Sequence, residues 1–204
     1  MIQLDERDSA KVRRVFFHEL GHYVAAILSQ RYFSGLGSRY IKIYRCRNKP
    51  EEFCGEMEPI KPENYNEKDL YLERLPENLV GLVYGCIFQS YFSKFINVSF
   101  CFEHFGGNDM CSFKGGIAKH RLGEVKAIKL HELYREHYTK IYDDKDLELL
   151  SEIDYKLLLI PNKDKEDEYF IDLSMLDSLL EGFLEDFKDI YCKLVMDFRE
   201  IIFE

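Results

Sequence analysis

The 204-residue sequence predicts a single α+β domain that is mainly α-helical, with a small β-sheet after the first helix. Apolar residues recur at three- and four-residue intervals between Val12 and Leu28, as they do on one face of a helix. Residues 39–45 then alternate between polar and apolar side chains, which is typical of a strand. The last 30 residues carry a broad apolar face at helical spacing, which predicts a long amphipathic helix.

Capping residues, turns and shorter patterns predict the remaining elements. Ser9 is a candidate cap for the first helix. A turn at residues 48–50 predicts that residues 53–60 return as a second strand. Further helices are expected over residues 67–93 and 109–142, and a hairpin is expected from residues 155–160 and 168–171.

Charge and hydropathy exclude two classes of partner. The formal net charge of −9 argues against nucleic acid, whose phosphates require a basic face. The most apolar stretch, residues 79–102, is interrupted at Lys94 before it reaches the roughly 20 apolar residues that cross a bilayer. We therefore expect no membrane insertion.

Cysteine usage and the first ten residues predict a cytoplasmic protein. Residues 1–10 are polar and charged and lack the apolar centre of a signal peptide. Reduced, buried thiols are expected in that compartment. The six cysteines are Cys46, Cys54, Cys86, Cys101, Cys111 and Cys192.

The segment His18-Glu19-Leu20-Gly21-His22 carries the clearest chemistry in the chain. Residues four apart lie on one face of a helix, so the imidazoles of His18 and His22 can both reach one zinc ion. Glu19 stands beside the first imidazole and is positioned to take a proton from a water bound to the metal. The segment predicts a zinc site with Glu19 as general base.

A catalytic zinc takes three protein ligands, so one more side chain is required. Leu28 excludes the extended motif that has a third histidine six residues after the second. Glu73, Glu77 and Asp109 are the candidates. Asp109 follows the glycines at 106–107 and could serve equally well as a helix cap. Spacing alone leaves these alternatives open.

The order of these features is similar to that in the peptidase domain of the FtsH-type ATP-dependent zinc metalloproteases. That family has a His-Glu-x-Gly-His helix, a small sheet, an apolar helix containing glycine, and an Asn-Asp-Leu-like segment that supplies the third ligand. The corresponding segments are residues 17–22, strands 40–44 and 53–59, residues 79–91 with Gly85, and residues 108–110. The resemblance implies a zincin-like metallopeptidase fold in which His18, His22 and Asp109 bind zinc and Glu19 is the base.

The resemblance covers about residues 12–142, and residues 143–204 form a C-terminal extension. In the family, the apolar helix carries a Gly-Gly-Arg-x-Ala-Glu-like signature, whereas residues 84–89 end in Gln89 and lack the acid. The chain also lacks a phosphate-binding loop, so it has no ATPase of its own. It therefore resembles a free-standing relative that acts on a peptide or unfolded protein, as a homo-oligomer or with a separate ATPase partner.

Two other functions fit parts of the pattern. A catalytically inactive binding or regulatory module would keep the fold without turnover. A membrane-embedded site-two-type protease would need several apolar spans, and the sequence lacks them. In a peptidase, an extended substrate is expected to add to the sheet edge near residues 41–44. His131 and His137 are expected at the surface. His104 and His120 are expected to be structural, with the alternative that His104, five residues before Asp109, faces the cleft and assists the oxyanion.

Overall fold

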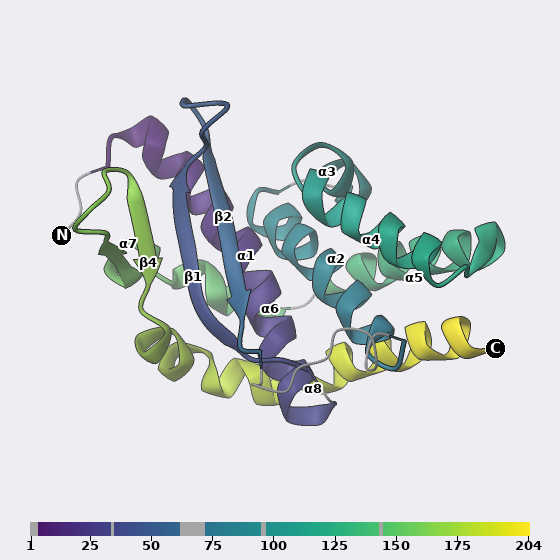
Figure 1. Ribbon diagram of the computed structural model, residues 1–204. Coiled ribbons are helices and arrows are strands. Elements are labelled where there is room, and N and C mark those ends of the chain that lie inside the picture. The colour runs from purple at the N-terminus through teal and green to yellow at the C-terminus, as the bar shows by residue number, and fades with distance from the viewer. Residues whose placement is uncertain (1–3, 34, 62–71, 95–96, 143–144) are drawn as a thin grey trace.

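The computed structural model describes residues 4–33, 35–61, 72–94, 97–142 and 145–204. Over these ranges the chain is mainly helical and has a four-stranded antiparallel sheet, which confirms the predicted mainly α-helical α+β class (Figure 1). The helices are α1 (Glu6–Tyr32), α2 (Leu75–Phe92), α3 (Val98–His104), α4 (Gly107–Lys119), α5 (Gly123–Tyr142), α6 (Lys145–Leu149), α7 (Tyr155–Leu158) and α8 (Leu173–Phe203). The strands are β1 (Ser38–Arg45), β2 (Phe53–Pro59), β3 (Leu159–Pro161) and β4 (Glu168–Ile171), and a short 3₁₀ turn spans Leu150–Glu152.

The N-cap of helix α1 lies four residues before the expected cap at Ser9. Asp5 is the N-cap, and its carboxylate accepts a hydrogen bond from the backbone N–H of Asp8 at 2.7 Å. Glu6 and Asp8 also place negative charge in the first turn, where the helix dipole favours it. Ser9 lies inside the helix, and its hydroxyl is hydrogen-bonded to the Tyr155 hydroxyl at 2.6 Å. The early start lengthens the helix that carries the histidine motif.

Helices α1 and α2 cross in close contact at Gly21, inside the motif. A Cβ atom at Gly21 would lie 2.2 Å from the backbone oxygen of Tyr84, a separation that no real side chain tolerates. The absence of a side chain therefore brings the motif directly against α2. The buried faces of both helices contribute to one hydrophobic core.

The sheet has the strand order β2-β1-β4-β3, so β2 is an edge strand. Strand β1 pairs with β2 and with β4, and Ile43 stands opposite Gly55 on one side and Tyr169 on the other. Figure 1 shows the β1–β2 hairpin lying alongside α1. The two strands expected after the first helix are confirmed.

The C-terminal extension packs against the elements that precede it. Strand β4 pairs with β1, and α8 packs against α1, α2 and α5. Tyr191 of α8 is fully buried, with its ring 5.3 Å from that of Tyr84 on α2. The predicted C-terminal amphipathic helix therefore packs against α1, which carries the motif, and against α2. The predicted hairpin is shorter than expected because residues 155–158 form the helical turn α7.

Two expected helices have different limits. The helix expected over 109–142 is divided into α4 and α5, because the chain turns at Arg121 and Gly123, both with positive φ. The helix expected over 67–93 is described from Leu75, with Pro76 in its first turn, and residues 67–71 lie outside the described residues. The short helix α3 was not predicted.

The prediction that all six cysteines are reduced and buried is wrong. Cys46 and Cys54 form a disulfide across the β1–β2 hairpin, with their Cα atoms 5.3 Å apart. Cys111 is exposed, whereas Cys86 and Cys101 are buried free thiols, as expected. Hairpin pairing brought the first two together, and this depends on the register between strands rather than on sequence spacing. In the described part of the chain, none of the helices has the length and apolar character needed to cross a membrane.

Candidate metal centre

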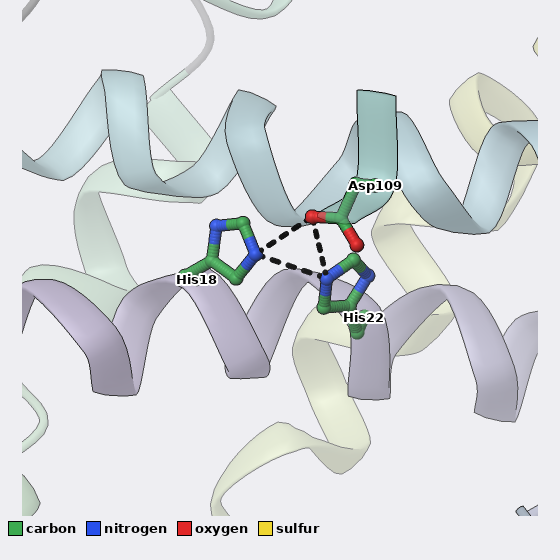
Figure 2. Close-up of side chains that lie close together, drawn as sticks. All are labelled: His18, His22 and Asp109. Atoms are coloured by element: carbon green, nitrogen blue, oxygen red, sulfur yellow. Dashed lines mark hydrogen bonds and ion pairs between the residues drawn. The ribbon is translucent and has the colours of Figure 1, made fainter. Parts of the chain in front are cut away.

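Three potential ligand atoms from two distant segments converge at one point. The Nε2 atom of His18 lies 2.9 Å from Oδ2 of Asp109 and 3.1 Å from Nε2 of His22. The third side of the triangle, from Nε2 of His22 to Oδ2 of Asp109, is 3.4 Å. Figure 2 shows the two imidazoles projecting from α1 toward the carboxylate of α4. These three residues are called the metal centre below.

The other ring nitrogens of the two histidines are held by hydrogen-bond acceptors. Nδ1 of His18 donates to the side-chain oxygen of Gln89 at 2.8 Å, and Nδ1 of His22 donates to the backbone oxygen of Gly81 at 2.8 Å. With Nδ1 carrying the proton, Nε2 of each neutral ring presents a lone pair toward Asp109. Such partners orient metal-binding histidines in proteins of many kinds.

The spacing of the three atoms fits a tetrahedral ion. Ligands at about 2.0–2.1 Å from a tetrahedral zinc lie roughly 3.3 Å from one another. The three observed separations, 2.9, 3.1 and 3.4 Å, are close to that value. Two imidazole lone pairs and a carboxylate repel one another unless a proton or a cation lies between them. The arrangement therefore has both the geometry and the charge of a cation site.

The position of Asp109 on α4 distinguishes it from the other candidates for a third ligand. Gly106, not Asp109, is the N-cap of that helix, so the capping interpretation is wrong. The buried Glu77 instead pairs with Arg199, at 2.6 Å between Oε1 and Nη2. Glu73 is exposed, and neither glutamate joins the cluster. Among the described residues, Asp109 is the acid that meets the two histidines.

Gly85 of α2 leaves room for the imidazoles. A Cβ atom there would lie 2.5 Å from Nε2 of His22 and 3.0 Å from Cε1 of His18. Any side chain at this position would occupy the space of the metal centre. Gly85 therefore leaves the space that the imidazoles of His18 and His22 occupy.

The metal centre is largely buried, and its charges are coupled. The side chains of His18 and His22 are each 13% exposed and that of Asp109 is 17% exposed. Burial opposes protonation of His22, but the Asp109 carboxylate outweighs it and raises the pKa of His22 to about 9. Burial likewise disfavours the charged form of Asp109, yet the two imidazoles hold its pKa well below the ordinary value. Without a metal, a proton on His22 therefore provides the positive charge.

Glu19 lies beside His18, His22 and Asp109 but is not one of the three residues that converge. It is 5% exposed, and burial raises its pKa above the ordinary value despite the nearby His22 and His18. Its carboxylate lies against β2, because a Cβ atom at Gly55 would be 2.2 Å from Oε1 of Glu19. Glu19 thus stands between the metal centre and the edge strand.

A cleft of about 440 Å³ exposes the metal centre to solvent. It lies between α1, β2, α2 and the start of α4, and we call it the metal cleft. Its lining includes the three residues of the metal centre, and also Glu19, Arg14, residues 53–57 of β2, Gln89 and Asn108. Donor atoms, a buried carboxylate and an edge strand therefore meet in one open depression.

The remaining histidines lie elsewhere. His104 is exposed on α3, with its ring 4.4 Å from that of Phe100, and it does not line the metal cleft. His120 is the C-cap residue of α4. His131 is half-buried against Phe113. The expectation that His137 lies at the surface is wrong, because it is buried and its Nε2 is hydrogen-bonded to the Tyr84 hydroxyl at 3.1 Å.

Gln89 is the site residue whose role the sequence did not reveal. It stands where the resembling family has an acid, and it was noted only as the absence of that acid. In the structure, the side-chain oxygen of Gln89 accepts a hydrogen bond from His18, and Gln89 is only 4% exposed. Its place at the end of residues 84–89, where the family signature has an acid, could have revealed this role. An amide oxygen accepts a hydrogen bond as a carboxylate does.

Comparisons with protein-family models, with curated proteins and with solved structures found no match for this chain.

Proposed function

We propose that this chain is a zinc-dependent metallopeptidase of the His-Glu-x-x-His type. The observation that carries the proposal is the convergence of two oriented imidazoles and one carboxylate beside the buried Glu19. Two nitrogens and one oxygen are a donor set that zinc accepts in catalytic sites, where a fourth position stays open. The zincin-like fold and the relation to FtsH-type peptidases belong to the same proposal.

Zinc bound here would polarise the scissile carbonyl and lower the pKa of a coordinated water to about 7. Glu19 accepts the proton of the attacking water and delivers it to the leaving amine. Burial, which raises the pKa of Glu19, suits this role because a more basic carboxylate takes a proton more readily. The hydrogen bonds to Gln89 and Gly81 keep both imidazoles in the orientation that binds the ion.

The substrate is expected to lie in extended form along β2. The earlier expectation placed it near residues 41–44, but these belong to β1, which is paired on both sides. Strand β2 is the edge strand, and residues 53–57 line the metal cleft. Main-chain hydrogen bonds to this edge would hold a peptide or unfolded protein next to Glu19.

Replacement of Glu19 by glutamine tests the mechanism. Glu19→Gln keeps the size of the side chain but removes its basicity, so cleavage of unfolded casein should fall at least about 100-fold while zinc is retained. Glu132→Gln, an exposed position on α5, serves as the matched control and should keep full activity. Unchanged cleavage by Glu19→Gln rules out this mechanism.

A catalytically inactive binding or regulatory module is the second candidate. The neutral Gln89 in place of an acid is the observation that favours it. Full zinc occupancy without cleavage of a broad peptide library would support that function. A homo-oligomer or a separate ATPase partner remains part of the proposal. The cytoplasmic location also stays a prediction, although the Cys46–Cys54 disulfide removes the support it drew from reduced thiols.

A further inference from the structure

The metal cleft continues along α1 to Arg14, one helical turn before His18. Residues four positions apart share a face of a helix, so Arg14, His18 and His22 follow one another along the same side of α1. Each step of four residues advances about 6 Å along the helix axis. All three residues line the metal cleft. The cleft therefore extends from the metal centre to a guanidinium group.

Two contacts hold the Arg14 side chain at this position. Its Nη2 atom lies 2.7 Å from Oε2 of Glu52, and its guanidinium carbon lies 5.1 Å from the centre of the Phe105 ring. Lys11 shares the same acid, with its Nζ atom 3.9 Å from Oε1 of Glu52. One carboxylate cannot neutralise two cations, so positive charge remains beside Arg14.

The Arg14 side chain can bind a further anion besides Glu52. A guanidinium group carries five N–H donors, and the hydrogen bond to Glu52 uses Nη2. The side chain is 29% exposed, about twice the exposed fraction of His18. The planar fork of donors matches a carboxylate group, which it binds through two parallel hydrogen bonds. A carboxylate that enters the metal cleft can therefore reach Arg14.

Other charged residues of the metal cleft have partners of their own. Among the described residues of its lining, Arg14 is the one arginine or lysine. Asp109 meets the two imidazoles, and Glu56 pairs with Lys42 at 2.9 Å between Oε2 and Nζ. Glu19 lies against Gly55. Within the cleft, the side chain that favours an incoming carboxylate is thus Arg14.

The direction of β2 indicates which side of a substrate reaches Arg14. Glu52, directly before β2, contacts Arg14, whereas Gly55 within the strand lies against Glu19. Strand β2 therefore runs alongside α1 from Arg14 toward the metal centre (Figure 1). The strand pairs of the described sheet are antiparallel, and a peptide that continues this pattern runs opposite to β2. Its C-terminal side then lies at Arg14.

We infer that Arg14 is a specificity-determining residue that binds a carboxylate group of the substrate, one or two residues beyond the cleaved bond on its C-terminal side. The inference rests on the proposed function, because the metal centre must hold the cleaved bond. The register agrees with the spacing, since an extended peptide advances about 3.4 Å per residue and one turn of α1 about 6 Å.

Two sources supply such a group. One is the C-terminal carboxylate of a peptide, in which case the enzyme removes residues from C-terminal ends. The other is the side chain of an aspartate or glutamate within a longer chain. Both offer the same two oxygens to the guanidinium group.

Peptide binding to the zinc-loaded Glu19→Gln protein tests the contact without turnover. The probes are fluorescein-labelled hexapeptides of alanine and leucine with a free C-terminal carboxylate or an amide, and fluorescence anisotropy measures their affinities. The free acid should bind about tenfold or more tightly than the amide. Adding Arg14→Gln should reduce this preference below about threefold. Arg7→Gln removes the same charge at an exposed position of α1 outside the metal cleft and should retain the preference.

A second pair of probes identifies the source of the carboxylate. These hexapeptides are amidated and end in glutamate or glutamine. A preference for glutamate that disappears in Arg14→Gln assigns the contact to an acidic side chain, and equal binding of this pair together with a preference for the free acid assigns it to the C-terminus. Either result supports the inference.

Glu52→Gln separates binding from a structural role of Arg14. It removes the same ion pair as Arg14→Gln but leaves the guanidinium group in place. The preference for the free acid should persist or increase, because a competing carboxylate has been removed. A loss as large as that in Arg14→Gln means that Arg14 acts only by holding Glu52, and overturns the inference.

The remaining outcomes separate this inference from the proposed function. Equal binding within both pairs of probes overturns the role of Arg14, as does a preference that persists in Arg14→Gln, which would place the carboxylate on zinc. Cleavage by the wild-type protein without any carboxylate preference leaves the metallopeptidase standing and overturns the inference. A preference that depends on Arg14 in a zinc-loaded wild-type protein that cleaves nothing supports the contact and overturns the peptidase. Failure to bind zinc or any of the peptides overturns both.

Discussion

His18 donates a hydrogen bond from Nδ1 to the side-chain oxygen of Gln89, at 2.8 Å. An amide at this position orients the imidazole but remains neutral, whereas a carboxylate would add negative charge and make the ring a stronger ligand. Gln89 therefore orients the His18 ring as a carboxylate would, but it adds no negative charge. This relationship determines how firmly the metal centre should hold zinc.

Changing Gln89 should alter zinc affinity in both directions. Gln89→Leu removes the acceptor and should weaken zinc binding about 10- to 100-fold, whereas Gln89→Glu should strengthen it. Competition with a chromophoric chelator measures both affinities. Gln30→Glu adds the same charge at an exposed position of α1 and should leave the affinity unchanged. Equal zinc affinity in Gln89→Leu and the wild-type protein contradicts the positioning role.

The metal-free protein should contain a protonated His22 at neutral pH. Burial opposes this charge, but Asp109 raises the pKa of His22 to about 9. The raised pKa contributes stability that is fully present below the unfolded value of about 6.5 and is lost as the pH rises through about 9. NMR titration of the imidazole nitrogens should find that transition, and Asp109→Ala should move it downward. A His22 transition near 6.5 in the metal-free wild-type protein is incompatible with the coupling.

Protonation of His137 should destabilise the fold in mild acid. Burial lowers the pKa of His137 to about 3, and its Nε2 is hydrogen-bonded to the Tyr84 hydroxyl. A lowered histidine pKa means that the unfolded chain binds the proton first, so stability falls as the pH decreases from about 6.5 toward 3. Between pH 7 and pH 5 the loss is about 2 kcal/mol.

His137→Gln is the variant that isolates this effect. Glutamine can still hydrogen-bond to Tyr84 but cannot take the proton. The free energy of unfolding of the variant should therefore fall less than that of the wild-type protein over the same range. Urea unfolding at several pH values measures the difference. His104→Gln changes an exposed histidine and should follow the wild-type curve. Parallel curves for wild type and His137→Gln would exclude a buried neutral imidazole.

Local patterns in the sequence were sufficient for the main elements and for two of the three residues of the metal centre. The four-residue spacing of His18 and His22 fixed their common face, and alternation over residues 39–45 predicted β1. Asp109 required more, because it lies 91 residues from His18 and reaches it only through the packing of α4 beside α2. Spacing alone could not choose between Asp109 and Glu77, which the structure separates by pairing Glu77 with Arg199.

Long-range pairing accounts for the other differences. The Cys46–Cys54 disulfide depends on hairpin register, and the burial of His137 depends on how α5 packs against α2 and α8. The substrate edge was assigned to β1 because β4, from residues 168–171, was not expected to pair with its free side. The local spacing of apolar residues in the sequence does not reveal any of these contacts.

The metal content of the purified protein tests the central claim most directly. The wild-type protein should contain about one zinc ion per chain, and Asp109→Ala should contain less than a tenth of that, because a site of two imidazoles retains zinc poorly. Asp186→Ala, at an exposed position of α8, is the matched control and should retain the wild-type amount. Undiminished zinc in Asp109→Ala, or a wild-type protein without zinc, would contradict the metal centre described here.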